Sequence, residues 1–438
     1  MIQTYLHTFR LFSRDTRLYL AANTVTSISY TGMYVMLFNL YLLRLGYGTE
    51  FIGLVNAAAQ LGVVVFSLPA GMLGHRWGVR RMLIVGPSVA TIGLGIIPLA
   101  EFVPTAWQAV WLVVTYIVAW LGGALYIVNS LPFVMSKTDS AERAHVLSVR
   151  EALVPLSLFA GSLIGGLLPG FLAAHLGASL ADPAPYRYAL FIAAALFSFA
   201  PLTFLATAET KAKEPPQQQL WTSTAAGQPA NRSAAPIGLI VFMAAVMLLQ
   251  LAGKSVTDTY FNVYLDVSLH LSPAWIGTLS AVAQLLVVPI ALIAPLIVIQ
   301  WGKGWTIIVG TLGMALSLLL LALFPHWGVA GLGLMGVSAL FAITTLAFSI
   351  CAQELVSPEW RATMSGAMAM AMGLSRSTMA FGGGYLITTF GFSSIFFVGA
   401  GLTAAGAILF WGYTWLPRRY ILYQRAESSA GRPLREAD

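Results

Sequence analysis

Three charged side chains interrupt long apolar stretches of the sequence: Lys254, Asp258 and Arg376. Gln250, Lys254 and Asp258 are spaced by four residues, so on a helix they would lie along one face. Because an isolated charge in apolar surroundings is costly, such residues usually face a polar cavity or pair with one another. This pattern predicts a site that binds a polar or charged ligand or exchanges a proton. A structural ion pair of Asp258 with Lys254 or with Arg376 is the alternative interpretation.

Uncharged polar and aromatic side chains in other apolar stretches could complete such a site. The candidates are Asn23, Tyr30, Tyr34, Tyr126, Asn129 and Gln353. Other chemistry is disfavoured, because the six histidines form no pair with metal-ligand spacing and the sequence has no Gly-x-x-x-x-Gly-Lys-Ser/Thr phosphate-binding loop. No nucleophile with a matching base is evident either. We therefore expect neither an enzyme nor a nucleotide-driven pump, and no cofactor or metal, with proton coupling left open.

The composition indicates what surrounds these residues. The chain has 438 residues, of which 58% are hydrophobic and only 9% are charged, and its mean hydropathy is +0.80. Soluble proteins average about 45–50% apolar and about 25% charged residues, so this chain cannot build an ordinary water-facing surface. The single cysteine, Cys351, excludes an internal disulfide. An all-α integral membrane protein is predicted.

Twelve apolar runs follow one another along the chain, each close to the roughly 20 residues that a helix needs to span a bilayer. They lie at about 18–43, 51–73, 82–100, 106–134, 146–174, 186–207, 237–265, 274–299, 304–324, 327–353, 362–389 and 392–416. Residues 208–235 are rich in Pro, Gln, Ser and Ala and are expected to form a flexible linker. We therefore expect two six-helix bundles, residues 1–207 and 236–438, the second ending in a tail.

The distribution of positive charge predicts which side the loops face. Of the 23 Lys and Arg residues, 19 fall on the side of the N-terminus, Arg44 and Arg187 on the opposite side, and Lys254 and Arg376 within spans. Cytoplasmic loops carry an excess of Lys and Arg, so both termini and the linker are expected in the cytoplasm, in a plasma or inner membrane. The net charge of +7 then reflects topology and anionic lipid, not a nucleic acid partner.

The two halves of the chain repeat one another. Matches recur in order at offsets of 218 to 224 residues: Phe38-Asn39-Leu40-Tyr41-Leu42 with Phe261-Asn262-Val263-Tyr264-Leu265, Ile52-Gly53 with Ile276-Gly277, Gln60 with Gln284, Trp77-Gly78 with Trp301-Gly302, Arg143-Ala144 with Arg361-Ala362, and Gly165 with Gly383. Such a duplication implies a pseudo-two-fold axis along the membrane normal, with the site between the halves near the midplane.

The loop after the second apolar run carries a motif of glycines and basic residues. Its members are Gly71, His75, Arg76, Gly78, Arg80 and Arg81. The motif resembles the signature between helices 2 and 3 of the major facilitator superfamily, which has a Gly, three residues, Asp-Arg, then Gly and two basic residues. The resemblance implies twelve helices in two pseudo-symmetric bundles, with helices 1, 4, 7 and 10 lining a central cavity.

This sequence departs from the superfamily's patterns at three places. His75 stands where relatives usually have an Asp that helps to lock helix 11 in the outward-facing state. The resemblance therefore implies a lock that is weaker or depends on pH, because histidine titrates near neutrality. The fourth span lacks the arginine of many proton-coupled relatives. The fifth keeps Gly161, Gly165 and Gly166 of the antiporter motif without its Pro.

The residues and the resemblance together predict a secondary transporter that works by alternating access. Efflux of a small amphipathic organic molecule is favoured, because a run of methionines would give the cavity an adaptable apolar wall. The run is Met368, Met370, Met372 and Met379, for which contact with lipid or packing in the core is the alternative interpretation. Uptake or exchange of an organic anion held by Lys254 and Arg376 is the alternative, and a receptor or scaffold that no longer transports is an alternative of another class. We expect a monomer whose partners are its substrate and membrane lipid.

Overall fold

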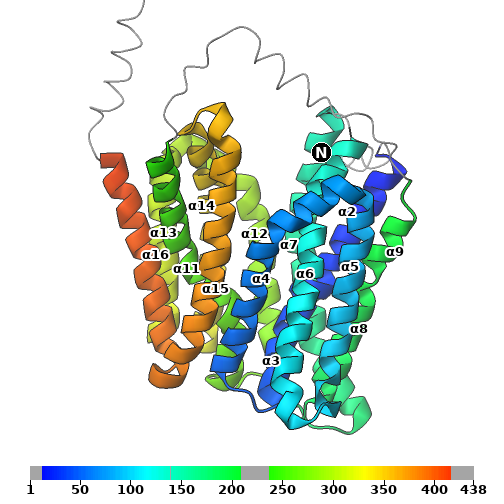
Figure 1. The fold of residues 1–438 in the computed structure, drawn as a ribbon. Coiled ribbons are helices and arrows are strands. Elements are labelled where there is room, and N and C mark those ends of the chain that lie inside the picture. Colours follow the sequence, from blue (N-terminus) through cyan, green and yellow to red (C-terminus); the bar gives the residue numbers. More distant parts are fainter. Residues whose placement is uncertain (1–11, 139, 209–235, 416–438) are drawn as a thin grey trace, which may run out of the picture.

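The computed structural model describes residues 12–138, 140–208 and 236–415, and every regular element in them is a helix (Figure 1). The helices are α2 (Arg14–Thr26), η1 (Ser27–Tyr34), α3 (Val35–Arg44), α4 (Thr49–Trp77), α5 (Val79–Ile96), η2 (Ile97–Phe102), α6 (Thr105–Lys137), α7 (Ser140–Leu176), α8 (Ala184–Phe197), α9 (Phe199–Leu205), α11 (Ile237–Val267), α12 (Pro273–Trp301), α13 (Lys303–Leu323), α14 (Trp327–Glu354), η3 (Pro358–Trp360), α15 (Arg361–Phe390) and α16 (Phe392–Trp415). The predicted linker, 208–235, lies outside the described residues except for Ala208.

These helices follow the twelve predicted apolar runs. The π-helix η1 joins α2 to α3 in the first path, the 3₁₀ helix η2 extends α5, and α8 continues into α9. Ten of the twelve paths are by themselves long and apolar enough to cross a membrane. The first is divided by η1, and the eleventh, α15, is less apolar because glycines, hydroxyl side chains and Arg376 interrupt it.

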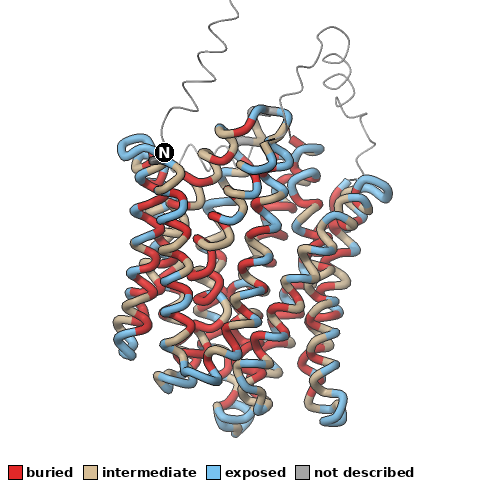
Figure 2. The backbone as a smooth tube through the Cα atoms, turned by 60° about the vertical axis from the view of Figure 1, so that its left-hand side comes forward, coloured by how far each residue is buried: buried red, intermediate tan, exposed pale blue. Residues whose placement is uncertain are grey.

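The outward faces of the helices suit a hydrocarbon environment. Large apolar side chains stay exposed on them, including Val65 and Leu68 of α4 and Leu292 and Ile299 of α12. Buried positions run along the length of the helices, whereas exposed positions gather at the helix ends and on outward faces (Figure 2). Exposed apolar surface of this extent marks contact with lipid or another apolar partner.

Helices α2 to α9 form one bundle and α11 to α16 the other, and the two meet along two helix pairs (Figure 1). α7 packs along α12, and α4 packs along α15. Glycines permit the close approach: a Cβ atom on Gly166 of α7 would lie 2.7 Å from Cα of Gly277 in α12. Small residues at such contacts let helix backbones approach closely in membranes.

The repeat seen in the sequence recurs in local structure. Gly78 and Gly302 each separate two helices with a positive φ, of 91° and 76°, which favours glycine. Arg143 donates from Nη2 to the carbonyl oxygen of Met135 at 3.3 Å, and Arg361 donates from Nε to that of Gln353 at 3.2 Å. Each arginine thus binds a carbonyl eight residues earlier, at the end of the preceding long helix.

The bundles diverge toward the end that carries the residues next to the linker, which we call the linker end (Figure 1). We call the opposite end the outer end. Hydrogen bonds and ion pairs that join the halves among the described residues lie between the middle and the outer end. They are Asn39 Nδ2 to Thr259 O (3.0 Å), Arg44 to Asp266 (2.6 Å), Thr49 Oγ1 to Gly384 O (3.3 Å) and to Thr388 Oγ1 (3.1 Å), and Ser377 Oγ to Ala57 O (3.2 Å). The structure is therefore a state closed at its outer end.

Candidate functional site

A cavity of about 100 Å³ lies between the two bundles. The first half contributes Thr31, Gly32, Val35, Met36 and Ser162, and the second half Lys254, Thr257, Asp258, Phe261, Asn262, Ser280, Gln284, Leu334 and Ser338. These residues come from η1, α3 and α7 on one side and from α11, α12 and α14 on the other. Polar side chains predominate, with an apolar patch beside them, so the cavity suits a small molecule with a polar and an apolar part.

The ion pair in this cavity joins Lys254 to Asp258, one helical turn apart on α11. The Lys254 ammonium also lies 5.7 Å from the centre of the Phe341 ring, a distance at which a cation is attracted to an aromatic face. The Lys254 side chain is only 13% exposed, whereas that of Asp258 is 42% exposed. The carboxylate is thus the more accessible member of the pair. In this state Asp258 pairs with Lys254 and not with Arg376.

Arg376 faces the interior of the molecule. Leu374, Phe381 and Tyr385 are exposed and mark the outward face of α15. With 3.6 residues per helical turn, Arg376 lies on the opposite face from all three. It makes no hydrogen bond or ion pair with any described residue, and its side chain is half-buried.

The two neighbours of Arg376 fix its place between helices. Ser375 Oγ donates to the carbonyl oxygen of Leu248 in α11 at 2.8 Å, and Ser377 Oγ donates to that of Ala57 in α4 at 3.2 Å. Arg376 therefore lies on the side of α15 that faces the space between α4 and α11. It does not belong to the lining of the cavity itself.

The polar stripe predicted on α11 extends beyond the ion pair. Gln250 is only 4% exposed, and its Nε2 has no hydrogen-bond partner among the described residues. It lines a second, very small cavity with Thr344, Thr345 and apolar residues of α11, α13 and α14. Asn262 lies on the same side of α11 as Asp258, one turn further toward the outer end, in the main cavity. Polar groups therefore follow one face of α11 through the middle of the protein.

Two other candidates from the sequence, Tyr34 and Asn129, form hydrogen bonds within the first bundle. Tyr34 donates its hydroxyl to the carbonyl oxygen of Leu94 at 2.7 Å. Asn129 donates from Nδ2 to the carbonyl oxygens of Ala70 (3.2 Å) and Leu125 (2.9 Å). A polar side chain in a helix bundle often satisfies a neighbouring backbone group in this way. The structure therefore does not bring these two residues to the cavity.

The remaining candidates also lie away from the cavity. The Tyr30 ring packs against Trp120 with centroids 5.4 Å apart. Asn23 and Tyr126 are buried in the first half. Gln353 donates from Nε2 to Ser365 Oγ at 2.8 Å near the linker end.

The methionine run on α15 does not line either described cavity. Met370 is 64% exposed on the outward side, and Met368 is buried in an apolar cluster of the second half. Met372 and Met379 pack against the apolar clusters. These methionines therefore do not form a cavity wall; the alternative interpretation, in which they face outward or pack against neighbouring helices, agrees with the structure.

Several cavity residues were missed from the sequence. They are Thr31, Ser162, Asn262, Ser280, Gln284 and Ser338. The repeat contained a usable signal for two of them, since Asn262 matches Asn39 and Gln284 matches Gln60. Both ends of the Asn39 amide are hydrogen-bonded, because Oδ1 accepts from Asn56 Nδ2 at 3.0 Å and Nδ2 donates across to the second half. The Asn262 Oδ1 accepts from Ser280 at 3.4 Å, and its Nδ2 has no partner among the described residues.

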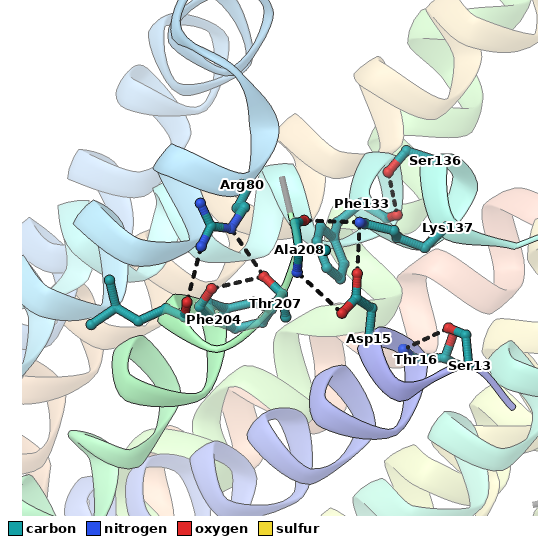
Figure 3. A network of polar contacts seen from close by, with 11 residues as sticks. Ser13, Asp15, Thr16, Arg80, Phe133, Ser136, Lys137, Phe204, Thr207 and Ala208 are labelled. Carbon is teal, nitrogen blue, oxygen red and sulfur yellow. Dashed lines mark hydrogen bonds and ion pairs between the residues drawn. The ribbon is translucent and has the colours of Figure 1, made fainter. Parts of the chain in front are cut away.

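The motif, at the C-terminal end of α4 and the start of α5, makes contacts between helices of the first half in this structure. Arg80 donates from Nε to Thr207 Oγ1 at 3.2 Å and from Nη2 to the carbonyl oxygen of Leu205 at 3.0 Å, at the C-terminus of α9 (Figure 3). A cation at this place interacts favourably with the last carbonyls of a helix. Gly74 leaves room for Asn129, whose side chain a Cβ atom would overlap. Gly71 adjoins Val128 of α6.

Within the described part of the chain, the other motif side chains form no hydrogen bond or ion pair with the second half in this state. His75, Arg76 and Arg81 are exposed at the linker end. Because α4 and α15 pack along each other, closure of the linker end would bring His75 toward the start of α15. The lock that the resemblance implies stays a prediction.

A second polar network ties the start of the linker to the first half (Figure 3). Lys137 and Asp15 form an ion pair of 2.6 Å. The Lys137 ammonium also donates to the carbonyl oxygen of Ala208 at 2.9 Å, and the Ala208 amide donates to Asp15 Oδ1 at 3.2 Å. The residue at which the chain leaves the first bundle is thereby held against α2 and α6.

Comparison with known proteins agrees with this architecture. A family model described as the Major Facilitator Superfamily matches residues 20–380. Among solved structures, the chain is similar to a D-xylose–proton symporter, with a TM-score of 0.72, 15% identity, and coverage of 91% of this chain and 97% of that one. It is similar to an inward open conformation of the xylose transporter XylE from E. coli, with a TM-score of 0.69, 14% identity and coverage of 92% and 97%.

A third similar structure is the nucleoside transporter NupG, with a TM-score of 0.69, 12% identity and coverage of 92% and 100%. No curated protein matches the chain at a significant level. Identities this low establish the shared fold and leave the substrate undetermined. The family model, however, covers most of the sequence and agrees with the helices and the repeat. The chain therefore belongs to the major facilitator superfamily and is a membrane transporter, not an enzyme.

Proposed function

We propose that the cavity between the bundles is the substrate site of an alternating-access carrier. Both halves line it, and an ion pair stands in its wall. The lining by both halves is the observation that carries the proposal. When two bundles rock against each other, a cavity between them opens first to one side of the membrane and then to the other. The bonds between halves lie toward the outer end, which supports access to the cavity from the linker end in this state. Breaking the contacts at the outer end would expose it to the opposite side.

The linker end is proposed to be cytoplasmic, which makes the structure an inward-facing state in a cell membrane. The excess of Lys and Arg on this side supports the assignment. The proposed domain division, residues 1–207 and 236–438 with linker 208–235, places the linker on the same side.

Thiol labelling in intact cells checks this orientation. Gly48→Cys and Gly227→Cys are each made in a Cys351→Ser background. A Cβ atom at Gly48 meets no atom within 4 Å, so the first substitution fits without strain. We expect an impermeant maleimide to label the Gly48→Cys variant from outside, and the Gly227→Cys variant only after permeabilisation. Labelling of both from outside would contradict the topology.

The proposed cargo is a small amphipathic organic molecule. Asp258, Asn262 and Gln284 offer hydrogen-bonding groups on one side of the cavity, and Val35 and Phe261 offer apolar surface. Efflux is kept as the favoured direction, with uptake or exchange of an organic anion as the alternative. Because the methionines do not line the cavity, they do not support efflux. The preference for this direction then depends only on the partial antiporter motif, Gly161, Gly165 and Gly166 of α7. The carrier is proposed to act as a monomer, with no cofactor other than a coupled proton.

A receptor or scaffold on the same fold is the alternative of another class. Such a protein would hold one state, so its cavity would be reached from one face only. A carrier must expose the same residues to both faces in turn. The two functions therefore differ in the accessibility of the cavity wall, which can be measured without knowing the substrate.

A further inference from the structure

The charges in the middle of the described spans do not cancel. Lys254 and Asp258 neutralise each other, whereas Arg376 has no described counter-charge. Charged pairs nearer the helix ends are matched, as in Arg187 with Glu101 at 2.7 Å and Lys137 with Asp15 at 2.6 Å. An unpaired charge at membrane depth is costly. Binding of a mobile negative charge would therefore stabilise the positively charged middle of the protein.

Arg376 stands on the route from the linker end to the cavity. Its neighbour Ser375 bonds to Leu248, six residues before Lys254. Arg376 is one residue further along α15, so it lies about 7.5 Å nearer the linker end than Lys254, at 1.5 Å per helical residue. Ser365 and Ala369 share its face of α15, closer to the linker end, and both are exposed. This face of α15 is therefore exposed near the linker end, and a solute entering from the linker end would meet Arg376 before Lys254.

The cavity beyond Arg376 offers hydrogen-bond donors as well as charge. Ser338 has a buried hydroxyl without a partner among the described residues. The Asn262 amide donor is also unused, and Gln284 adds a second amide. Lys254 supplies an ammonium whose present partner, Asp258, is the more exposed of the two. These groups can surround the two oxygens of a carboxylate once Lys254 is shared with it.

We propose that the cargo is a small organic monoanion, whose carboxylate binds first at Arg376 and then at Lys254. This inference rests on the proposed function and names its substrate class, and it holds for either direction of transport. One negative charge on the cargo restores neutrality in the middle of the protein. A neutral molecule would leave Arg376 without a counter-charge, and a cation would add to the excess.

Thermal unfolding of the purified full-length protein tests this with probes matched in shape: benzoate, benzamide and benzylamine, and hexanoate with hexanamide. We expect at least one carboxylate to raise the Tm at a concentration about tenfold lower than its amide, because a charge-assisted hydrogen bond is stronger than one between neutral groups. Arg376→Gln should remove this advantage, and Arg376→Lys should retain much of it. Arg17→Gln, at an exposed arginine of α2 outside the cavity, is the control and should change nothing.

Three results would overturn the inference: no stabilisation by any carboxylate, equal stabilisation by an amide, or an unchanged preference in the Arg376→Gln variant. The proposed function would survive these results if the cavity wall is still labelled from both faces. If that labelling comes from one face only, the proposed function fails whatever the probes do. The two failures are therefore distinguishable.

Discussion

Replacing Asp258 by asparagine is expected to strengthen binding of benzoate about tenfold and to lower the free energy of unfolding by about 1–3 kcal/mol. The variant leaves Lys254, whose side chain is 13% exposed, without its counter-charge. The stability loss lies between the roughly 0–1 kcal/mol of exposed pairs and the roughly 3–5 kcal/mol of buried ones. Binding tightens because Asp258 no longer competes with the anion for Lys254. Asparagine also takes up no proton, so accumulation driven by a pH gradient should be lost.

The double variant Lys254→Met/Asp258→Asn is the matched control for this prediction. It removes both charges, so thermal stability should return while the gain in benzoate binding disappears. Both quantities are measured in the same thermal unfolding series. If the double variant instead regains stability and binds benzoate like the Asp258→Asn variant, the pair is purely structural and its role in anion binding is wrong.

Arg44→Ala is expected to open the outer end and to shift the population by tenfold or more toward the outward-facing state. Arg44 binds Asp266 across the halves through two hydrogen bonds of 2.8 and 2.6 Å, and it donates from Nε to the carbonyl oxygen of Leu180 at 2.9 Å. Its guanidinium also lies 5.2 Å from the centre of the Tyr186 ring. A half-buried bidentate pair of this kind contributes more than an exposed one, and about 1.4 kcal/mol already gives a tenfold shift.

Spin labels at Gly48→Cys and Ser268→Cys measure this opening, because they report the distance between the halves at the outer end. The Arg187→Ala variant is the control, since it breaks a comparably buried ion pair with Glu101 inside the first half. We expect a population with a longer distance in the Arg44→Ala variant only. An unchanged distance distribution there, or an equal change in the control, would mean that the Arg44–Asp266 pair does not hold the outer end closed.

The membrane fold could be predicted from the sequence because its determinants are local. Apolar runs of about 20 residues specify spanning helices, and the repeat specifies two related halves. The polar stripe on α11 was also predictable, since a spacing of four places Gln250, Lys254 and Asp258 on one helix face. Lys254 and Asp258 line the main cavity, and Gln250 lines the smaller one.

The rest of the cavity depends on how helices face one another, which a single sequence does not show. Tyr34 and Asn129 carry polar groups, as Asn262 does, but they donate hydrogen bonds to carbonyl oxygens inside the first bundle. Thr31 and Ser338 also line the cavity, but Ser and Thr residues are common throughout the spans, so these two could not be distinguished from the others in the sequence. The state of the carrier was equally unpredictable, because it depends on contacts such as that between Arg44 and Asp266, 222 residues apart.

The central claim, that one cavity serves both faces of the membrane, is tested most directly by labelling a cavity residue with the outer end locked. Ser280→Cys, in a Cys351→Ser background, places a thiol in the cavity wall. Thr49→Cys with Thr388→Cys adds a disulfide at the outer end, where the two hydroxyls lie 3.1 Å apart. Modification at position 280 by an impermeant thiol reagent is measured by mass spectrometry, with the reagent added to either face of sealed vesicles. We predict modification from both faces without the disulfide, and from the linker face only with it. Modification from the outer face through the intact disulfide, or from one face alone in its absence, would contradict alternating access.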